Sequence, residues 1–383
     1  RMTRFQYANA VKDLLDLKVE VFPLPEKMMR DRSGYFKPGS GKMPAKMTVS
    51  SRALGKSGLI EPRMDGVAPF PQDLRAEHGY DTQGDHLSLS PLLMEDFFRL
   101  SRSIVKSPSF NQKNVGSWTK YFGEPKPEVN QIAELKTRLR SLLTLAFRRP
   151  VQDQTFRKYF SYAKQQIDQG LGMGDVMKEV LSAILASPRF LYLYDQDDKE
   201  SIQPDSSLNL DLASRLSFFL WGSLPDEELL QTAKNGVLVE EEQLSKQVDR
   251  MLTDNKLKRF CDSFPTQWLQ LDRIISAVPD EKKYRDFYYA APLYRTTMDM
   301  MMEPLLLFET VLIEDRSILE LIDSNFTYRS SRLRKWYGEE PEGKLSGPVS
   351  MAFQRQSVED RRHGGVITNG AVMTMTSGPL DTK

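Results

Sequence analysis

Residues 208–230, LNLDLASRLSFFLWGSLPDEELL, form the most sharply punctuated stretch of the chain and predict two helices that meet at a corner. Apolar residues recur at intervals of three and four, which gives the first helix an apolar stripe. The stripe consists of Leu212, Leu216, Phe219 and Leu220, widened by Ala213 and Phe218. Gly222 should end this helix. Ser223 and Asp226 have the spacing of a capping box around Pro225, so a second helix should begin at once. The corner specifies architecture and offers no chemistry.

The length of the chain, 383 residues, exceeds the usual limit of one hydrophobic core and predicts two or three domains. The hydrophobic content of 40% and the charged content of 27% are ordinary for a globular protein. A formal net charge of +1 gives no general attraction to nucleic acid or to membrane surfaces. No apolar run reaches the roughly 18 to 20 residues of a membrane-spanning helix. We therefore expect neither a nucleic-acid partner nor a membrane span.

Cys261 is the single cysteine, which restricts the sites that the chain can form by itself. One cysteine excludes an internal disulfide, a zinc site with several cysteines and the C-x-x-C-H attachment of a c-type haem. Because no histidine is near it in sequence, Cys261 is interpreted as a small core residue rather than a nucleophile. The chain opens on Arg1 inside an expected helix, without a signal peptide, and we expect it to be part of a longer protein.

The N-terminal region combines an amphipathic helix over residues 5–15 with a basic segment that has no helical period. From about residue 30 to residue 71 the sequence is rich in Gly, Pro, Ser, Lys and Met. Residues 1–60 hold twelve Lys/Arg against five Asp/Glu. Such a segment is usually a solvated insertion, and the alternative is a basic loop that contacts an anionic partner.

A polar loop ahead of the next helix resembles part of a calcium site. Asp81, Gln83 and Asp85 alternate as oxygen donors around a glycine, although the bidentate Glu of an EF-hand is missing from its twelfth position. The loop is therefore either a calcium site or an Asx-turn that caps the helix. Ser90 and Pro91 predict the start of that helix, as N-cap and first helical residue.

Helical patterns dominate the middle of the chain. Residues 128–195 predict three helices that end at Pro and Gly residues, and an acidic linker follows over 195–205. After the corner, the longest helical pattern runs from about residue 292 to residue 313 and should kink at Pro304. Its many methionines are expected to fill the core, with an adaptable ligand groove as the alternative.

The last part of the chain changes character. Residues 328–337 predict one more short helix, and GPVSMAFQRQ at 347–356 suggests a strand. We therefore expect a small mixed segment at the C-terminal end of a helical protein.

The candidate site lies in this segment. Asp360, Arg362 and His363 crowd before a Gly-Gly pair, and Thr374 and Thr376 follow. Charged residues beside glycines that allow close backbone approach are typical of ligand sites. His363 is the candidate general base or metal or haem ligand, with Arg362 and Asp360 as catalytic neighbours and Thr374 and Thr376 as cofactor contacts. The alternative is a polar turn held by Arg–carboxylate pairs.

Several motifs resemble one family. They are FRRPV at 147–151 with SPRFLYLY at 187–194, ASRLSFFLWGSLPDEELL at 213–230, EDRSILELIDSNFTY at 314–328 and HGGVITNGAVMTMTSG at 363–378. In this order they resemble the Planctomycete-type domains of unknown function, which recur in large secreted or periplasmic bacterial proteins. TRFQYANAVKDLLDL at 3–17 and GDHLSLSPLLMEDFF at 84–98 resemble the first domain of that series, split by the basic insertion. The resemblance covers nearly the whole chain.

The resemblance implies a cell-envelope redox protein, because family members are commonly fused to c-type cytochrome modules before the first domain and after the last. Haem c would then sit on flanking modules, and the protein would be periplasmic or secreted. The family has no established catalytic residues, so none is transferred to this chain.

Two hypotheses follow. In the first, the helical body is the substrate- or partner-binding part of an oxidoreductase that passes electrons to haem on flanking modules. Its substrate would be a small molecule or a carbohydrate, and the loop at 359–377 would face the haem or the substrate. In the second, the chain is a non-catalytic scaffold or binding module. The residues alone favour the second, because no acid–base pair, nucleophile–base pair or phosphate loop is recognisable.

The sequence thus predicts a mainly α-helical protein made of consecutive helical modules. The expected domains are residues 1–127 with the basic insertion at about 30–71, a three-helix module over 128–197, a larger helical domain with the Met-rich helix over 206–338, and the start of a C-terminal domain over 345–383.

Overall fold

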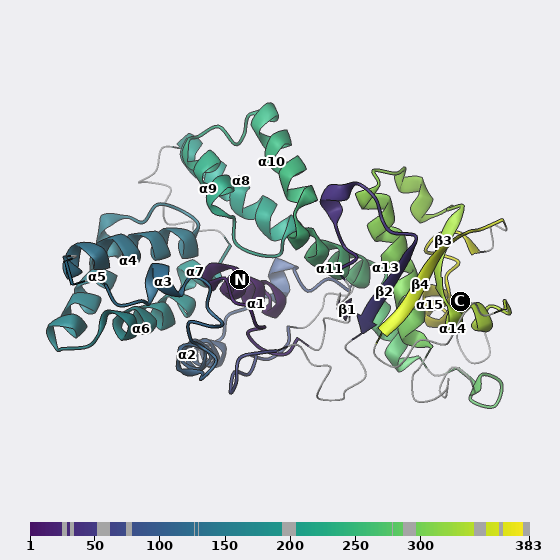
Figure 1. Cartoon of the computed structure of the whole chain (residues 1–383), viewed down its shortest axis with the longest axis horizontal. Coiled ribbons are helices and arrows are strands. Elements are labelled where there is room, and N and C mark those ends of the chain that lie inside the picture. Colours follow the sequence, from purple (N-terminus) through teal and green to yellow (C-terminus); the bar gives the residue numbers. More distant parts are fainter. Residues whose placement is uncertain are drawn as a thin grey trace. The chain divides into compact units, whose positions relative to one another are not determined.

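The chain is mainly α-helical, as predicted, with one small antiparallel sheet (Figure 1). The structure is a computed structural model. It describes residues 1–24, 29–30, 34–51, 62–73, 79–125, 127–128, 130–193, 204–277, 279–285, 296–340, 350–359 and 363–377. The chain forms two compact units. Unit 1 comprises Arg1–Leu24, Glu61–Ala76 and Asp81–Asp249, and unit 2 comprises Pro25–Ile60, Glu77–Tyr80 and Arg250–Lys383.

Unit 1 is a helical array. Its helices are α1 (Arg4–Leu15), α2 (Pro91–Lys106), α3 (Trp118–Tyr121), α4 (Gln131–Phe147), α5 (Asp153–Asp168), α6 (Met173–Leu185), α7 (Pro188–Leu191), α8 (Pro204–Leu220), α9 (Glu227–Lys234) and most of α10 (Glu241–Thr253). The 3-10 turn η3 (Gly84–His86) precedes α2. Ser90 caps α2 and Pro91 is its first residue, as predicted.

The core of unit 1 gathers segments that are far apart in sequence. Tyr7 of α1 is fully buried and contacts the rings of Phe22, Phe70, Phe97 and Phe190, at centroid distances of 5.5 to 6.5 Å. Aromatic pairs at such distances add to the free energy of simple burial. Tyr7 therefore ties the N-terminal helix to α2 and α7.

The corner between α8 and α9 forms at the predicted position, but the residue that caps α9 differs from the predicted one. Gly222 has a φ of +56°, in the left-handed region that favours glycine, and it follows the end of α8. The N-cap of α9 is Asp226, whose side chain accepts from the N–H of Leu229. The predicted capping box beginning at Ser223 is wrong: this serine lies outside the helix, and its hydroxyl has no hydrogen-bond partner among the described residues.

The buried face of α8 matches the predicted stripe only in part. Ala213, Phe218 and Leu220 are buried as predicted, whereas Phe219 is 61% exposed. Leu212 and Leu216 are half-buried, and Ser214 and Ser217 are buried in addition. Ser217 donates its hydroxyl to the carbonyl of Ser214, so its burial leaves no unpaired donor. Apolar periodicity missed the two serines because serine is a polar residue.

Arg148 explains why the segments FRRPV and SPRFLYLY occur together. It ends α4 with a φ of +61°. Its buried guanidinium donates to the carbonyl oxygens of Arg189, Phe190 and Tyr192 around the end of α7. These carbonyls have no helical partner at a helix end, so a charged donor satisfies them. The neighbouring Arg149 pairs with Asp211 of α8 at 2.8 Å.

Unit 2 packs helices against the sheet. Its helical elements are η1 (Pro38–Ser40), η5 (Asn255–Leu257), α11 (Lys258–Trp268), η6 (Leu271–Ser276), α13 (Thr297–Ile313), η7 (Ile318–Leu321), α14 (Ser331–Trp336) and α15 (Gly370–Met375). Its strands are β1 (Met29–Arg30), β2 (Lys46–Ser51), β3 (Phe326–Ser330) and β4 (Ser350–Ser357), in the spatial order β1-β2-β4-β3. All the pairings are antiparallel.

The sheet corrects two predictions. The basic segment at about 30–71 is no mere solvated insertion, because it supplies β1 and β2, and Met47 and Val49 of β2 are buried. The short helix predicted over residues 328–337 is present as α14, but it begins three residues later than predicted. The β-branched and aromatic run FTYRS forms β3, and Ser330 then caps α14 by accepting from Leu333. The strand predicted at 347–356 is present as β4.

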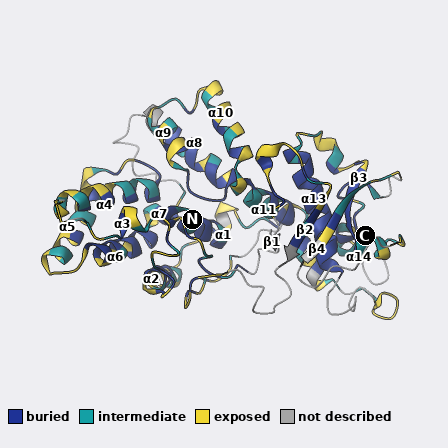
Figure 2. Ribbon diagram, viewed as in Figure 1, coloured by how far each residue is buried: buried dark blue, intermediate teal, exposed yellow. Residues whose placement is uncertain are grey.

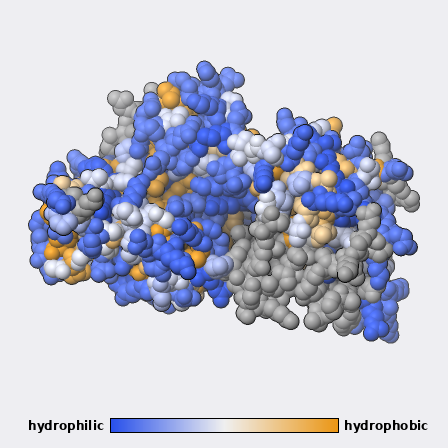
Figure 3. All heavy atoms as spheres, in the orientation of Figure 1, coloured by the Kyte–Doolittle hydropathy of each residue, from blue (hydrophilic) through white to orange (hydrophobic). Residues whose placement is uncertain are grey.

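The Met-rich helix α13 is the centre of unit 2. Nearly all of its residues are buried, and its four methionines fill the core as expected (Figure 2). It contacts α11, β3, α14 and α15 and runs through Pro304. On the face shown in Figure 3, hydrophilic residues cover most of the described surface. Within the described part of the chain, no helix is both long enough and apolar enough to span a membrane.

The four consecutive domains remain a prediction. The compact units follow contacts between distant segments, so that β2 of the N-terminal region belongs to the same unit as β3 and β4.

Candidate functional site: a cationic cavity beside a buried acidic helix

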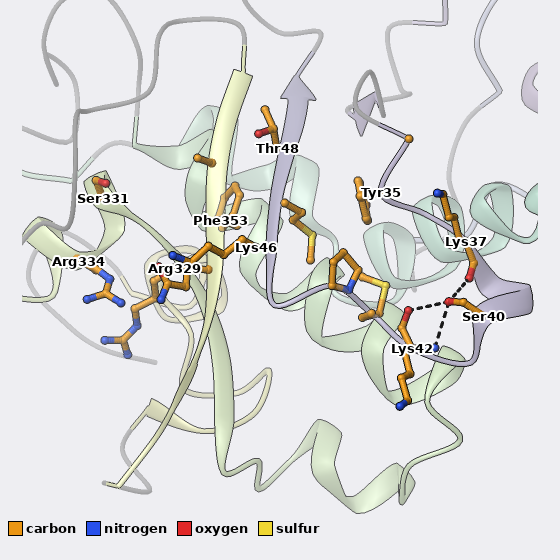
Figure 4. Close-up of a pocket in the computed structure, with 16 residues that line it drawn as sticks. Tyr35, Lys37, Ser40, Lys42, Lys46, Thr48, Arg329, Ser331, Arg334 and Phe353 are labelled. Atoms are coloured by element: carbon orange, nitrogen blue, oxygen red, sulfur yellow. Dashed lines mark hydrogen bonds between the residues drawn. The ribbon is translucent and has the colours of Figure 1, made fainter.

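Unit 2 contains an open cavity of about 730 Å³ that is lined by residues of three neighbouring strands, β2, β4 and β3 (Figure 4). The residues that line it come from the segment before β2, from strands β2, β4 and β3 and from α14. They are Gly34, Tyr35, Lys37, Ser40, Lys42, Met43, Pro44, Lys46, Met47, Thr48, Arg329, Ser331, Arg334, Ala352, Phe353 and Gln354. Five of them are Lys or Arg and none is Asp or Glu.

The register of the sheet explains how these cations meet. Gln354 of β4 pairs with Lys46 of β2 on one side and with Arg329 of β3 on the other. Directly paired residues in an antiparallel sheet point to the same face, so these three side chains form a row across it. Thr48 and Ala352 pair two residues further along and share this face.

Three lysines of the cavity carry unneutralised charge. Lys37, Lys42 and Lys46 are exposed, and none of them forms an ion pair with another residue that the structure describes. Close-up views place Lys37 and Lys42 on one side of β2 and Arg329 and Arg334 beyond β4 (Figure 4). The three lysines therefore give their side of the cavity a positive charge, which suits an anionic ligand.

Acidic residues of α13 hold the walls of this cavity in place. On one side, Glu309 is completely buried and accepts a hydrogen bond of 2.8 Å from the hydroxyl of Tyr35. The Lys258 Nζ lies 2.6 Å from the same carboxylate and also pairs with Asp262. Glu314, just beyond α13, accepts from the N–H of Met43 at 3.2 Å. The segment before β2 is thus anchored to the buried helix.

The opposite wall is held by Glu303. Its carboxylate accepts hydrogen bonds of 2.8 Å from the hydroxyls of Thr327 and Tyr337. The Arg329 Nε is 3.9 Å from it, and the same guanidinium pairs with Glu339 and lies 4.4 Å from the centre of the Tyr337 ring. One helical turn earlier, Asp299 accepts from Ser330 and pairs with Arg332 at 3.4 Å. These contacts fix β3 and α14 behind the cations.

Burial shifts the proton equilibria of this network. It raises the pKa values of Asp299, Glu303 and Glu309 above the ordinary carboxyl values, and the adjacent hydrogen bonds and cations offset only part of the effect. Burial alone would lower the pKa of Lys258, but the carboxylates of Asp262 and Glu309 outweigh it and raise that pKa. Burial followed by the charge of Glu303 raises the pKa of Tyr337. Tyr337 therefore acts as a hydrogen-bond donor.

His363 is connected to this network. Its half-buried ring lies 5.6 Å from the Tyr337 ring, edge to face. The hydroxyl of Tyr337 also accepts a hydrogen bond of 2.7 Å from the N–H of Gly370, the first residue of α15. A chain of contacts through Tyr337 and Glu303 thus connects His363 with Arg329, which lines the cavity.

The other predicted site residues do not gather around His363 in what the structure describes. Asp360 and Arg362 lie outside the described residues. Thr376 is exposed and donates its hydroxyl to the carbonyl of Val372, and Thr374 is half-buried in α15. The roles assigned to these residues stay predictions. The chain has one cysteine, Cys261, which is buried, so it holds no C-x-x-C-H motif for the attachment of a c-type haem.

The calcium interpretation also stays a prediction. Asp81 is half-buried and Gln83 is exposed ahead of η3, whereas the side chain of Asp85 is outside the described set. Among the residues with described positions, no three His, Cys, Asp or Glu side chains gather as a metal site would require.

Sequence reasoning missed the residues that build the cavity. Asp299 and Glu303 are four residues apart in a helix whose residues are mostly apolar, and buried acids are rare unless they are paired. This four-residue spacing of two acids was the sequence signal that could have revealed the buried network. The lysine excess of residues 1–60 was noticed, but Arg329 and Arg334 lie almost 300 residues away, and only the sheet brings them to the same cavity.

Comparison with known families assigns the chain to a class without assigning an activity. Residues 58–107, 134–195 and 208–338 match three families, each described as "Protein of unknown function": DUF1587, DUF1595 and DUF1592, respectively. The chain belongs to the planctomycete-type multidomain proteins of unknown function that these domains define. No curated protein and no solved structure gave a match to the chain.

Proposed function

We propose that this chain is the binding part of a cell-envelope redox protein and that the cationic cavity of unit 2 receives its anionic substrate or partner. Haem c on flanking modules would supply the electron-transfer chemistry. The observation that carries the binding role is the cavity itself, in which five cations meet and no carboxylate lines the wall.

The network behind the cavity supports binding rather than chemistry within this chain. The described contacts of Glu303 and Glu309 hold neighbouring segments, and neither carboxylate lines the cavity. A preorganised cationic surface binds anions with little reorganisation of the protein. His363, which reaches this network through Tyr337, is the residue that we assign to the side facing a haem or a substrate.

A second function, that of a non-catalytic scaffold, is favoured by the same contacts. Three acids of α13 join elements that are distant in sequence: Asp299, Glu303 and Glu309. In this function their hydrogen bonds and ion pairs serve only to hold the fold together. The two functions make different predictions, because only the binding role requires the exposed lysines of the cavity to contact a ligand.

The binding role is tested by titrating the protein with sulfate and with phosphate in a calorimeter. We expect binding that weakens as salt rises from 50 to 200 mM, because salt screens exposed charges. The triple variant Lys37→Gln, Lys42→Gln, Lys46→Gln should bind about tenfold more weakly, at about 0.5 kcal/mol per exposed ion pair. Lys335→Gln, an exposed lysine of α14 outside the cavity, is the matched control. Absence of binding, or equal binding by the triple variant, would leave the scaffold role.

The redox part requires the full-length protein. If haem c flanks this chain, the protein should show a Soret band that changes on reduction. His363→Ala should then alter its spectrum or its reduction potential, since His363 is assigned to the haem or substrate side. An unchanged spectrum and potential would remove His363 from that role.

A further inference from the structure

Two of the exposed lysines in the cavity, Lys37 and Lys42, lie on one segment, residues 34–45, which we call the strap. The strap has a buried residue near each end: Tyr35 ahead of Lys37, and Met43 directly after Lys42. The strap is therefore attached to unit 2 on both sides of the two cations.

The attachment at Tyr35 is a hydrogen bond to a buried charge. Its hydroxyl donates to Oε2 of the fully buried Glu309 at 2.8 Å. The Nζ of Lys258 lies 2.6 Å from Oε1 of the same carboxylate and 5.4 Å from the centre of the Phe36 ring. Hydrogen bonds to ionised groups are roughly twice as strong as those between neutral groups. Removal of the Tyr35 hydroxyl should therefore loosen this end of the strap.

The exposed turn between the two attachments is held by its own hydrogen bonds. The hydroxyl of Ser40 lies 2.7 Å from the carbonyl oxygen of Lys37 and 2.9 Å from that of Lys42 (Figure 4). Beyond the turn, the N–H of Met43 donates to Glu314 at 3.2 Å, a longer bond than that of Tyr35. The position of the turn on unit 2 thus depends on its two ends.

The third exposed lysine is held in a different way. Lys46 lies on β2 and pairs with Gln354 of β4 in the register of the sheet. Its backbone is therefore positioned by the hydrogen bonds between the two strands and not by the strap. The three lysines divide into two whose positions depend on Tyr35 and one that serves as an internal reference.

We propose that Tyr35 is a positioning residue of the anion site: by binding the strap to Glu309, it holds Lys37 and Lys42 in place for the anion. A segment that is already ordered loses less conformational entropy when a ligand binds, so the attachment raises the affinity through the strap. This inference rests on the proposed anion-binding function and adds a residue to its site.

The variant Tyr35→Phe tests this role, because it keeps the buried ring and removes only the hydroxyl. We expect it to bind sulfate about fivefold more weakly than the wild type in a calorimetric titration, which is the share of two of the three exposed lysines. Tyr328→Phe is the matched control and should bind like the wild type. Tyr328 is a buried tyrosine of β3 outside the cavity, and its hydroxyl accepts a hydrogen bond from Thr310. Equal binding by Tyr35→Phe and the wild type would overturn the inference and leave the anion site intact.

Combined variants separate positioning from a general loss of structure. In the Tyr35→Phe background, the double change Lys37→Gln and Lys42→Gln should cost little further affinity, because the loosened strap has already withdrawn these lysines. Lys46→Gln should cost as much in this background as in the wild type. If the strap lysines keep their full effect in the Tyr35→Phe background, Tyr35 does not act through them and the inference fails.

Limited digestion with trypsin, followed by mass spectrometry, measures the strap directly. Without sulfate, the bond after Lys42 should be cleaved faster in Tyr35→Phe than in the wild type, and sulfate should slow this cleavage in the wild type. Cleavage after Lys335, which is exposed on α14 in unit 2, should be unchanged and reports an intact fold. Equal cleavage after Lys42 in the two proteins would show that Tyr35 does not hold the strap. If the wild type binds no sulfate, the proposed function falls, and the role of Tyr35 falls with it.

Discussion

At the scale of single residues, Glu303 is a carboxyl group whose proton equilibrium depends on its neighbours. It is buried, accepts from Thr327 and Tyr337, and stands 3.9 Å from Arg329. Burial raises its pKa above the ordinary value of 4.5, although these partners favour the charged form. The folded state therefore binds the Glu303 proton more tightly than the unfolded state does.

This difference predicts a pH dependence with a defined sign. Because the folded pKa is raised, the contribution of Glu303 to the free energy of unfolding is fully present below pH 4.5 and decreases as pH rises through the folded pKa. Glu303→Gln keeps an acceptor for Tyr337 and removes the titration. The stability of the wild type relative to this variant should thus fall as the pH rises above 4.5, as measured by urea unfolding over a pH series. A difference that is constant or grows with pH would contradict the raised pKa.

Part of this residue-level picture could be predicted from sequence. Cys261 was interpreted as a core residue and is buried, and the methionines of α13 fill the core. The partners of Glu303 could not be predicted, because Thr327 and Tyr337 reach it through a strand and a turn whose placement depends on tertiary packing.

At the scale of elements, Arg148 joins the end of α4 to the end of α7. Its guanidinium donates to three carbonyl oxygens there, and it is 3% exposed. Arg148→Met should lower the free energy of unfolding by about 3 kcal/mol, because the buried guanidinium is the charged donor to these carbonyls and the apolar side chain of Met cannot replace it. Arg157→Met, on the exposed face of α5, is the matched control and should change it by less than about 0.5 kcal/mol. Urea unfolding followed by circular dichroism measures both, and equal losses would refute the role of Arg148.

Elements were predictable where their signals are local. The start of α2 at Ser90 and Pro91 and the end of α8 at Gly222 follow from caps and backbone preferences. Strand β2 was missed, because its partner β4 lies about 300 residues away and six residues are too few for a clear period. The cavity could not be predicted for the same reason, because its floor forms only when β2 pairs with β4.

At the scale of the whole molecule, the chain has two compact units with separate cores. The aromatic cluster around Tyr7 lies entirely in unit 1, and the buried helix α13 lies in unit 2. Units with their own cores can unfold separately. A change confined to one unit should then move one unfolding transition and spare the other.

Gly365 provides this test. Its φ of +84° is strained for other residues, and a methyl group there would overlap the carbonyl oxygen of Ile322. Gly365→Ala should therefore destabilise unit 2 by about 3 kcal/mol and lower one of two calorimetric transitions. Gly338→Ala, with a φ of +77° but open space around it, should cost only about 1 kcal/mol in the same unit. Arg148→Met should lower the other transition, because Arg148 belongs to unit 1. If Gly365→Ala and Arg148→Met instead shift a single common transition, the units unfold together and their cores are not energetically independent.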